Sequence, residues 1–347
     1  MTMADAKVRF RYLSLEETIA AGATDMAKAI EDVEKVLSLE DDGKVIHPHK
    51  TAMRWGDAAS EYDFGRINAM PGYVGGDINM AGIKWIGSTP RNIKRGQPRA
   101  CGLTILNDPE TKYPVALMDG TVISAIRTGA CGGVAVKYLV KKNAATMGLY
   151  GAGVQGRTQL MAAKVVRPSL KLVKLYEPDL ERARSFANDM SKECNVEIAT
   201  MKAPEDAAKS VDFIVSATMT VEKVVYYKWL DPKGLTCLNI GGNEYDDDMV
   251  LKAAKTYADS IDAVVDRNSN TIARMINEKR FDREKYYADL GAVINRKKEG
   301  RTGDEFIYFA SVGSGLFDIA VAARVLKEAE KNNIGAMLTL WNEPWFI

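Results

Sequence analysis

The spacing of apolar residues changes along the chain. Ser14–Glu17 have a capping-box pattern, which predicts the start of a helix. Apolar residues then recur at helical spacing, at Met26, Ala27, Ile30, Val33, Val36 and Leu37. From about residue 50 to 118 the pattern becomes short β-like runs broken by turns, with Asn107–Thr111 as the turn of a hairpin. This part predicts a mostly antiparallel sheet with flanking helices.

A helix is predicted from Thr121, as its capping residue, to about Leu139. Its middle is rich in small residues, at Ala125, Gly129, Ala130, Gly132 and Gly133. Glycine inside a helix costs about 1 kcal/mol relative to alanine. Several such residues together indicate that another element packs very closely against this helix.

Beyond Ala145, short apolar runs alternate with helical stretches. The predicted strands are TMGLYG, LVKLYE, DFIVSAT, LTCLNIG and AVVD. This alternation is typical of a parallel, doubly wound sheet. The run that starts at Gly315 predicts an amphipathic helix that stops at Asn333–Gly335, and AMLTLW predicts a final strand. We expect this tail to return to the first domain.

The loop after the first of these strands has the spacing Gly-x-Gly-x-x-Gly. It comprises Gly151, Gly153, Val154, Gln155 and Gly156, with Ala152 between the first two glycines. Because the motif follows an apolar strand and opens a helix-compatible stretch, it fits the fingerprint of a dinucleotide-binding Rossmann domain. The first glycine would allow the tight turn, the second the approach of the pyrophosphate, and the third the packing of helix on strand. The phosphates would face the positive end of the helix.

An acid at the end of the second strand bears on which cofactor binds. Glu177 lies 26 residues after Gly151, where a carboxylate accepts hydrogen bonds from ribose hydroxyls and repels a 2′-phosphate. We therefore expect NAD(H) in preference to NADP(H), although Arg182 could host a phosphate if the loop turned. Ala217 and Thr218 end a later strand and are expected to line the same crevice. A Rossmann-like domain with a purely structural role is the alternative.

Composition narrows the class of protein further. The 347 residues are 46% hydrophobic and 27% charged with a net charge of +1, so no overall field attracts nucleic acid or an anionic membrane. No apolar run approaches the roughly 18–20 residues that span a bilayer. Four widely spaced cysteines fit a reducing cytoplasm. A proline separates His47 from His49, the only histidines, and no cysteine or further histidine lies nearby, so we expect no metal site.

Three basic residues in the first part of the chain are candidates for substrate binding. Lys84 lies between two apolar residues in a strand-like run, and Arg127 lies among small residues of the glycine-rich helix. Arg54 is the third. Cations in apolar settings should be paired with an anion. For isolated basic residues, a surface salt bridge or a side chain that reaches solvent is the usual explanation.

An ordered series of motifs resembles the ornithine cyclodeaminase/mu-crystallin family over nearly the whole chain. The motifs are GIKWIGSTPRN, CGLTILNDPETKYPVALMDGTVISAIRTGA, GAGVQGRTQ and YADLGAVINRKKEGRTGDEFIYFASVGSGLFDIA. The resemblance implies an α/β fold with a Rossmann dinucleotide-binding domain over 127–310. It also implies an α+β domain for substrate binding and dimerisation over 1–126 and 311–347, a small amino-acid or imino-acid substrate, and a homodimer.

The resemblance also assigns roles to residues. Arg54, Lys84 and Arg127 match the family's carboxylate-binding positions, and two guanidinium groups with an ammonium can clamp an α-carboxylate. Such a clamp would place the substrate Cα against the nicotinamide, in a cleft between the two domains. Thr128 is an expected cofactor contact. Ser311 and Gly313 are expected to approach the nicotinamide, with a packing role as the alternative.

The residue after Gly241 and Gly242 bears on the reaction. Cyclodeaminases of the family have an aspartate where this chain has Asn243, and an amide cannot take a proton. We therefore expect Lys84 and Asn243 at the catalytic centre, with Lys84 as proton donor or acceptor. The predicted function is NAD-dependent oxidation of the C–N bond of an amino acid or opine-like conjugate through an imine, or the reverse. Ornithine cyclodeaminase and a non-catalytic, mu-crystallin-like protein that binds NAD(P)H are the alternatives.

Asn243 is followed by a cluster of acids. Glu244 or Asp246 could replace the missing aspartate if the loop shifted by one residue. Asp246–Asp248 otherwise fit the start of a helix near Met249, which acids would cap. Consecutive aspartates point in different directions, so a single metal ion could not bind all three.

Overall fold

The computed structural model describes residues 7–55, 65–220 and 222–345. The chain divides into two compact units. Unit 1 comprises Met1–Asp25, Asp42–Arg127 and Ser314–Ile347, and unit 2 comprises Met26–Asp41 and Thr128–Gly313. Helix α2 (Met26–Asp41) thus belongs by its contacts to unit 2, whereas the prediction from the sequence was that it lies in the domain of residues 1–126.

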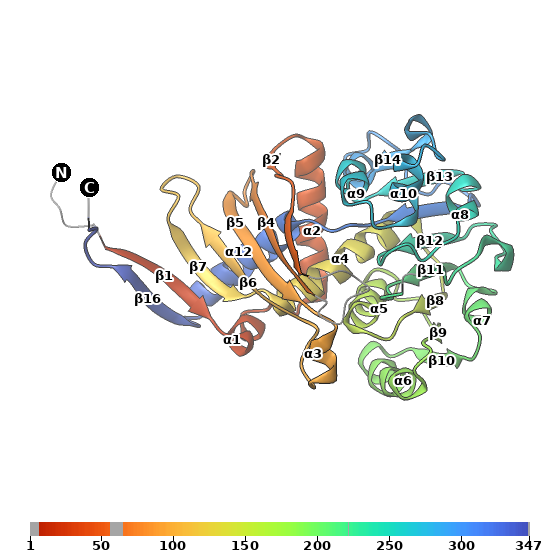
Figure 1. The fold of residues 1–347 in the computed structure, drawn as a ribbon, viewed down its shortest axis with the longest axis horizontal. Helices are drawn as coiled ribbons and strands as arrows, with labels where there is room; N and C mark the ends of the chain where they lie inside the picture. Colours follow the sequence, from red (N-terminus) through yellow and green to blue (C-terminus); the bar gives the residue numbers. More distant parts are fainter. Residues whose placement is uncertain (1–6, 56–64, 221, 346–347) are drawn as a thin grey trace. The chain divides into compact units, whose positions relative to one another are not determined.

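Unit 1 is built on one sheet with the strand order β16-β1-β7-β6-β5-β4-β2, and β3 also pairs with β4 (Figure 1). The strands are β1 (Val8–Leu13), β2 (Val45–Ile46), β3 (Thr51–Trp55), β4 (Gly65–Val74), β5 (Met80–Ser88), β6 (Ala100–Asn107), β7 (Pro114–Asp119) and β16 (Ala336–Trp341). All neighbours are antiparallel except β1 and β7, which confirms the predicted sheet. Asp108 accepts from the backbone N–H of Thr111, as the predicted hairpin turn requires.

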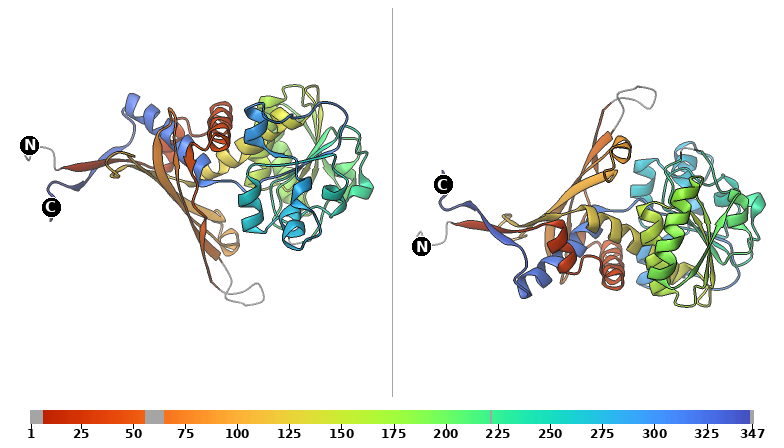
Figure 2. Two further views of the ribbon diagram at one scale, coloured as in Figure 1. Left: turned by 90° about the horizontal axis from the view of Figure 1, so that it is seen from above. Right: turned by 90° about the horizontal axis from the view of Figure 1, so that it is seen from below.

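The helices of unit 1 are α1 (Leu15–Ala20), α3 (Arg91–Lys94) and α12 (Gly315–Lys331). The predicted capping box at Ser14 is present. Helix α12 packs on β4, β5 and β6, and its close approach needs Gly315, because a Cβ there would lie 2.5 Å from the Met70 carbonyl oxygen. The chain then turns at Asn333 and Gly335, and β16 pairs with β1 (Figure 2). The predicted return of the tail is confirmed.

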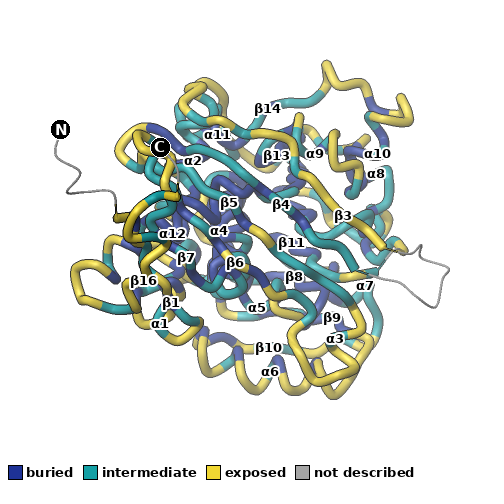
Figure 3. Tube along the Cα trace, turned by 60° about the vertical axis from the view of Figure 1, so that its left-hand side comes forward, coloured by how far each residue is buried: buried dark blue, intermediate teal, exposed yellow. Residues whose placement is uncertain are grey.

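Unit 2 contains a wholly parallel sheet in the order β10-β9-β8-β11-β12-β15-β13-β14. Its strands are β8 (Thr146–Tyr150), β9 (Leu172–Tyr176), β10 (Glu197–Met201), β11 (Phe213–Ser216), β12 (Thr236–Asn239), β13 (Lys255–Ala258), β14 (Ala288–Asp289) and β15 (Ile307–Ala310). Strands β11, β12 and β15 are buried along their whole length, and Figure 3 shows the burial along the chain. Such burial on both faces explains why these runs are continuously apolar in the sequence.

The helices of unit 2, besides α2, are α5 (Val154–Val166), α6 (Leu180–Cys194), α7 (Pro204–Ala208), α8 (Asp248–Leu251), α9 (Ile261–Arg267), α10 (Thr271–Asn277) and α11 (Leu290–Ile294). Short 3-10 turns lie at Tyr227–Trp229 and Arg283–Lys285. In α2 the predicted apolar stripe is buried, except that Ala27 is exposed and Ala29 is buried in its place. The stripe packs against α5 and α11.

One predicted strand is wrong. The run AVVD lies within helix α9, and the strand of this region is β13, which precedes it. The buried residues of α9 are Ile261 and Val264, one helical turn apart. A short apolar run does not distinguish a strand from a buried helical turn, because each pattern needs more residues to show its period.

Helix α4 (Thr121–Leu139) crosses from unit 1 into unit 2 with the predicted bounds. Its capping acceptor is not Thr121 but Asp119, which accepts from the N–H groups of Thr121 and Val122. The close neighbour that its glycines predict is α5. A Cβ at Gly129 would lie 2.5 Å from the Thr158 carbonyl oxygen, so only glycine permits this packing.

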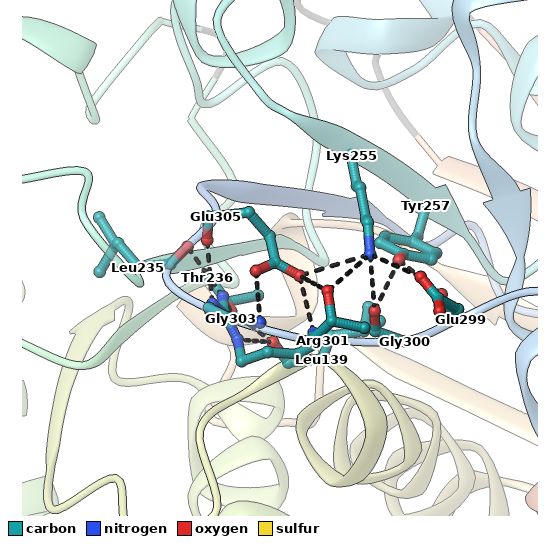
Figure 4. Close-up of polar contacts among 11 residues, drawn as sticks. Leu139, Leu235, Thr236, Lys255, Tyr257, Glu299, Gly300, Arg301, Gly303 and Glu305 are labelled. Atoms are coloured by element: carbon teal, nitrogen blue, oxygen red, sulfur yellow. Dashed lines mark hydrogen bonds and ion pairs between the residues drawn. The ribbon is translucent and has the colours of Figure 1, made fainter.

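The segment GRTGDE, part of the family resemblance, is a structural connection within unit 2 (Figure 4). The Arg301 guanidinium donates to the carbonyls of Leu139 and Leu235 and to the Thr236 hydroxyl. Burial lowers the pKa of Arg301. Because all of these acceptors are at the ends of other elements, Arg301 joins the end of α4 to the start of β12.

Candidate functional site

The glycine loop between β8 and α5 has the geometry of a phosphate-binding turn. Gly151 has φ +100°, and a Cβ there would lie 2.8 Å from the Ala217 carbonyl oxygen. A Cβ at Gly156 would lie 2.1 Å from the Gly151 carbonyl oxygen, so the helix meets the strand there. Gly153 is the N-cap of α5, and nothing lies within 4 Å of its Cβ position. The space beside Gly153 is therefore open to a ligand, next to the N-terminus of the helix.

The acid predicted to accept hydrogen bonds from the ribose lies directly beside this loop. Glu177 follows β9 and accepts from the Ala152 backbone N–H at 3.0 Å and from the Asp179 N–H at 3.2 Å. The Arg182 side chain donates to Glu177 at 2.9 Å. Because its guanidinium is paired with this carboxylate, Arg182 is not poised as a 2′-phosphate receptor. The geometry therefore fits NAD better than NADP.

The end of strand β11 meets the glycine loop. The Ala217 N–H donates to the Tyr150 carbonyl, which places Ala217 and Thr218 next to Gly151. Both residues are partly exposed. Val154 is 62% exposed at the first turn of α5, and Gln155 is partly exposed beside it.

Glu244 is a structural residue of this crevice. It is fully buried, and its two carboxylate oxygens accept from Ser216 Oγ, Asn239 Nδ2, and the N–H and hydroxyl of Thr218. Burial raises its pKa, and these hydrogen bonds oppose the rise. With its oxygens engaged and no exposed surface, Glu244 is poorly placed to replace the acid absent at Asn243.

The acids after Glu244 hold surface elements together. Asp246 accepts from the Tyr227 N–H, and Asp247 forms ion pairs with Lys223, Arg274 and Arg280. Helix α8 begins at Asp248, and the Asp247 side chain makes no capping hydrogen bond. At this helix start the Met249 N–H donates to the Asp246 carbonyl.

Asn243 lies beside α10. Its Oδ1 accepts from the Thr271 hydroxyl at 3.2 Å, and the residue is partly exposed. The hydrogen bond orients the amide without engaging its Nδ2 donor group. Asn243 therefore has a donor, but no proton acceptor of useful strength, to offer a ligand.

The loop that contains Ser311 and Gly313 is held by a buried acid that was not predicted from the sequence. Asp259 accepts from Ser311 Oγ at 2.8 Å and from the Gly313 N–H at 2.7 Å. Asp259 is 4% exposed, and burial raises its pKa against the effect of these hydrogen bonds. The loop therefore has one defined conformation, in which Gly313 takes φ +66°.

Thr128 connects helix α4 to α5. The Gln159 side chain donates to the Thr128 carbonyl at 2.9 Å, and Gln159 itself is buried. Thr128 is partly exposed. It stays a predicted cofactor contact.

In unit 1, two of the three predicted carboxylate-binding residues meet at a buried acid. Lys84 Nζ lies 2.8 Å from Asp318 Oδ2 and donates to Ser124 Oγ at 3.2 Å. Arg127 Nε lies 3.1 Å from the same oxygen of Asp318. The three residues are 2%, 6% and 0% exposed, so their charges interact outside bulk water. Two cations and one anion leave a net charge of +1, which suits one bound carboxylate.

Asp318 was missed by the sequence analysis. It lies on α12, flanked by the buried residues Phe317 and Ile319. An acid on the apolar face of an amphipathic helix was the available signal, since such a charge must be paired. Its Oδ1 atom is buried and accepts no hydrogen bond from the protein.

Arg54 does not join this cluster. It is exposed on β3 and lies directly opposite Arg66 on β4. Lys84 is opposite Met70, four residues further along β4 from Arg66. Lys84 and Arg127 are thus brought together at Asp318. Arg54 lies elsewhere on the sheet that contains Lys84.

The fold and these two sites define a class of protein, the NAD-dependent oxidoreductases of amino and imino acids. Unit 2 provides the dinucleotide loop, and unit 1 provides a buried cluster of two cations and one acid. The chain belongs to the ornithine cyclodeaminase/mu-crystallin family, whose sequence profile matches residues 14–333. The resemblance found in the sequence is confirmed.

Individual relatives cover nearly the whole chain. It is 31% identical to N-((2S)-2-amino-2-carboxyethyl)-L-glutamate dehydrogenase of Staphylococcus aureus over 335 residues, which are 95% of this chain and 98% of the relative. Thermococcus litoralis Delta(1)-pyrroline-2-carboxylate reductase, solved with NADH and L-proline, has a TM-score of 0.86 at 32% identity, over 94% of this chain and 99% of that one. An archaeal alanine dehydrogenase dimer with bound NAD has a TM-score of 0.86 at 30% identity, covering 96% of this chain and 100% of its own.

These likenesses agree with the predicted activity and cofactor. The chain is an NAD-dependent oxidoreductase that acts on the C–N bond of an amino acid or amino-acid conjugate. Within residues 7–55, 65–220 and 222–345, no helix is long and apolar enough to cross a membrane. The same ranges contain no group of three or more His, Cys, Asp and Glu residues that could hold a metal ion.

Proposed function

We propose that this protein interconverts an α-amino acid, or an opine-like secondary amine built on one, and the corresponding imine, with Lys84 and Arg127 holding the α-carboxylate. The single observation that carries this proposal is the buried cluster of Lys84, Arg127 and Asp318, with its net charge of +1. A carboxylate bound there would gain charge-assisted hydrogen bonds that a neutral ligand lacks.

Residues of unit 2 fit the cofactor. The open space at Gly153 would take the pyrophosphate, and the Glu177 carboxylate would accept from the ribose. When bound, NAD supplies the acceptor for the hydride that leaves the substrate Cα. Ser311 and Gly313 are proposed to contact the nicotinamide, with Asp259 fixing their loop.

Lys84 is the proposed proton carrier. A substrate amine enters mostly as an ammonium, and it must lose a proton before the C–N bond can gain double-bond character. Lys84 Nζ is held between Asp318 Oδ2 and Ser124 Oγ, so its position is fixed by two acceptors. In its neutral form it can take that proton, and in its charged form it can return one in imine reduction. Asn243 would donate a hydrogen bond without taking the proton.

The proposal is tested by following NADH absorbance with a panel of amino acids and N-substituted amino acids. Arg127→Met should raise KM for every substrate with an α-carboxylate by about tenfold or more, because one charge-assisted contact is lost. Arg95→Met, at an exposed arginine after α3, is the matched control and should behave as the wild type. An unchanged KM in Arg127→Met would show that Arg127 does not bind the α-carboxylate.

We further propose that the chain forms a homodimer through the sheet face opposite Lys84. Trp85 and Leu103 are direct cross-strand partners on that face, and each is 41% exposed. Met53, on the same face, is 40% exposed. Adjacent exposed apolar side chains favour a protein partner, and the archaeal alanine dehydrogenase of this fold is described as a dimer. Light scattering should show a dimer for wild type and Lys112→Glu, and a monomer for Trp85→Glu.

We propose a cytoplasmic location because the cysteine thiols are free. None of the four cysteines forms a disulfide, and three of them are buried. Free thiols persist in reducing compartments. Titration of freshly isolated, denatured protein should find all four thiols, and a smaller number would argue against this location.

A further inference from the structure

One face of the unit 1 sheet bears a row of polar residues that extends beyond the Lys84 cluster. Lys84 on β5 is paired with Met70 on β4 and with Thr104 on β6. Residues two apart on a strand share a face, so Asn68 and Arg66 of β4 lie on the same face as Lys84. Arg54 is the cross-strand partner of Arg66 and extends this row onto β3.

Two members of the row have buried polar atoms that no described residue pairs with. Asn68 is 5% exposed and Thr104 is fully buried. Within the described ranges of the chain, neither Asn68 Oδ1 nor Thr104 Oγ1 has a hydrogen-bond partner. A buried polar atom without a partner costs free energy, so each such atom calls for a ligand or a water molecule. Thr104 lies opposite Lys84, and Asn68 lies on β4 between Arg66 and the residue opposite Lys84.

At the far end of the row, three arginines lie close together. The Arg99 carbonyl accepts from the Thr89 N–H, which places Arg99 beside the end of β5 where Ser88 pairs with Arg66. Burial lowers the pKa of Arg66, and the charges of Arg54 and Arg99 lower it further. Burial also lowers the pKa of Arg99, whose Nε is buried and unpaired.

This arrangement is costly unless an anion joins it. Like charges placed together in a partly buried setting repel one another, and proteins normally pair such cations. Among the residues that the structure describes, none of these three arginines forms an ion pair with a carboxylate. Arginine is also the side chain best suited to bind a carboxylate, through two parallel hydrogen bonds.

We propose that Arg66 and Arg99, assisted by Arg54, form a second anion subsite that binds the distal carboxylate of an amino-acid conjugate. This proposal rests on the proposed function, because the α-carboxylate of the same molecule would lie at Lys84 and Arg127. Asn68 Oδ1 lies between the two subsites and would accept a hydrogen bond from the substrate N–H. Arg54 then belongs to the distal group of the substrate, whereas the family resemblance placed it at the α-carboxylate.

The spacing sets the length of the substrate. Arg66 and the residue opposite Lys84 are four positions apart on β4, which is about 13 Å along the strand at roughly 3.3 Å per residue. The long side chains of Lys84 and Arg66 shorten the gap, so several bonds would separate the two carboxylates. A simple amino acid such as alanine would fill only the Lys84 end.

A matched pair of probes isolates the distal charge. N-(2-carboxyethyl)-L-alanine has an α-carboxylate, a secondary amine and a second carboxylate. Its amide, N-(2-carbamoylethyl)-L-alanine, has nearly the same shape without that second charge. Homologues with longer arms test the spacing. NADH formation is measured for wild type, Arg66→Met, Arg99→Met and the control Arg95→Met, and melting temperatures establish that each variant is folded.

The wild type and Arg95→Met should prefer the carboxylate probe of best length over its amide by about tenfold or more in kcat/KM. Arg66→Met and Arg99→Met should lose that preference, because kcat/KM falls more with the carboxylate probe than with the amide. Arg66→Lys should retain part of it, because the charge remains. Equal use of both probes by the wild type, or a preference that persists in both methionine variants, would overturn the subsite.

Calorimetry without cofactor separates this proposal from the reaction. If no probe yields NADH, the proposed function fails, and binding of the two probes still tests the subsite. Tighter binding of the carboxylate probe than of the amide, lost in Arg66→Met, would support it. Equal binding of the two probes to the wild type would refute it.

Discussion

The ammonium of Lys84 lies 2.8 Å from the carboxylate of Asp318, and the two side chains are 2% and 0% exposed. The residues are 234 positions apart in sequence, on β5 and α12. Arg127 approaches the same carboxylate oxygen at 3.1 Å. Removing Asp318 would therefore leave two buried cations facing each other, whereas removing either cation would leave a neutral pair.

Asp318→Asn should destabilise the protein by about 3–5 kcal/mol, the usual cost of breaking a buried ion pair. The reason is that Lys84 and Arg127 lose their shared counter-ion while staying out of water. Urea unfolding at neutral pH measures the effect. Asp304→Asn, which disrupts an exposed ion pair with Lys141, is the control and should leave the unfolding midpoint unchanged. A midpoint for Asp318→Asn equal to that of the control would contradict the pairing.

The glycine loop allows packing and cofactor binding to be separated. Gly156→Ala should destabilise the fold by about 1–3 kcal/mol, because its Cβ would lie 2.1 Å from the Gly151 carbonyl oxygen. Gly153→Ala should leave stability unchanged, because its Cβ position is open, and should weaken NAD binding. Thermal unfolding and fluorescence titration with NADH measure the two effects. Normal NADH affinity in Gly153→Ala would show that the pyrophosphate does not approach this residue.

The dinucleotide loop was predictable because its context is local. Gly151, Gly153 and Gly156 follow one strand and open one helix, so a short stretch of sequence contains the strand, the turn and the helix start. The partner of Lys84 was not predictable in the same way. Asp318 meets Lys84 only because α12 packs on β5, and spacing along the chain holds no information about that contact. The same applies to Asp259, which reaches Ser311 from a neighbouring strand end.

The misassigned strand at AVVD has a different cause. Two buried residues, Ile261 and Val264, fit a helical turn, while the apolar run Ala263–Val265 also fits a short strand. Local composition left the choice open, and packing against the parallel sheet decided it. Arg54 illustrates a further limit: its position opposite Arg66 follows from the register of β3 and β4, which spacing along the chain does not give.

Glu177 should determine the preference between NAD and NADP. Glu177→Ser removes the carboxylate that would repel a 2′-phosphate and frees Arg182, which donates to it at 2.9 Å. The ratio of kcat/KM for NAD to that for NADP should fall by about tenfold or more. Arg182→Met alone should keep the preference for NAD. A ratio that Glu177→Ser leaves unchanged would place the ribose elsewhere.

L-ornithine distinguishes dehydrogenation from cyclodeamination. Asn243 is held by Thr271 through its Oδ1 and cannot take a proton, so cyclisation with release of ammonia should not occur. Any turnover of L-ornithine should therefore form NADH in step with substrate loss. Absorbance and an ammonia assay, run together, check this balance. Ammonia and proline formed without accumulation of NADH would show that the protein is a cyclodeaminase after all.

Asp289 should make stability fall as pH rises through the acid range. Burial raises its pKa to about 6, although its Oδ1 accepts from Tyr286 OH and the Ile261 N–H, and the charge of Asp259 adds to the rise. The unfolded value is about 3.9. Between about pH 4 and pH 6 the native state therefore holds a proton that the unfolded state has lost.

Protonated Asp289 thus stabilises the native state fully below about pH 4. This stabilisation, ~3 kcal/mol at most, is lost as pH rises through 6. Asp289→Asn resembles the protonated acid at every pH, since an amide is neutral and its oxygen can still accept from the Ile261 N–H. Unfolding in urea from about pH 4 to pH 7 should show the stability of Asp289→Asn rising relative to wild type. A difference between the two proteins that does not vary with pH would show that Asp289 titrates normally.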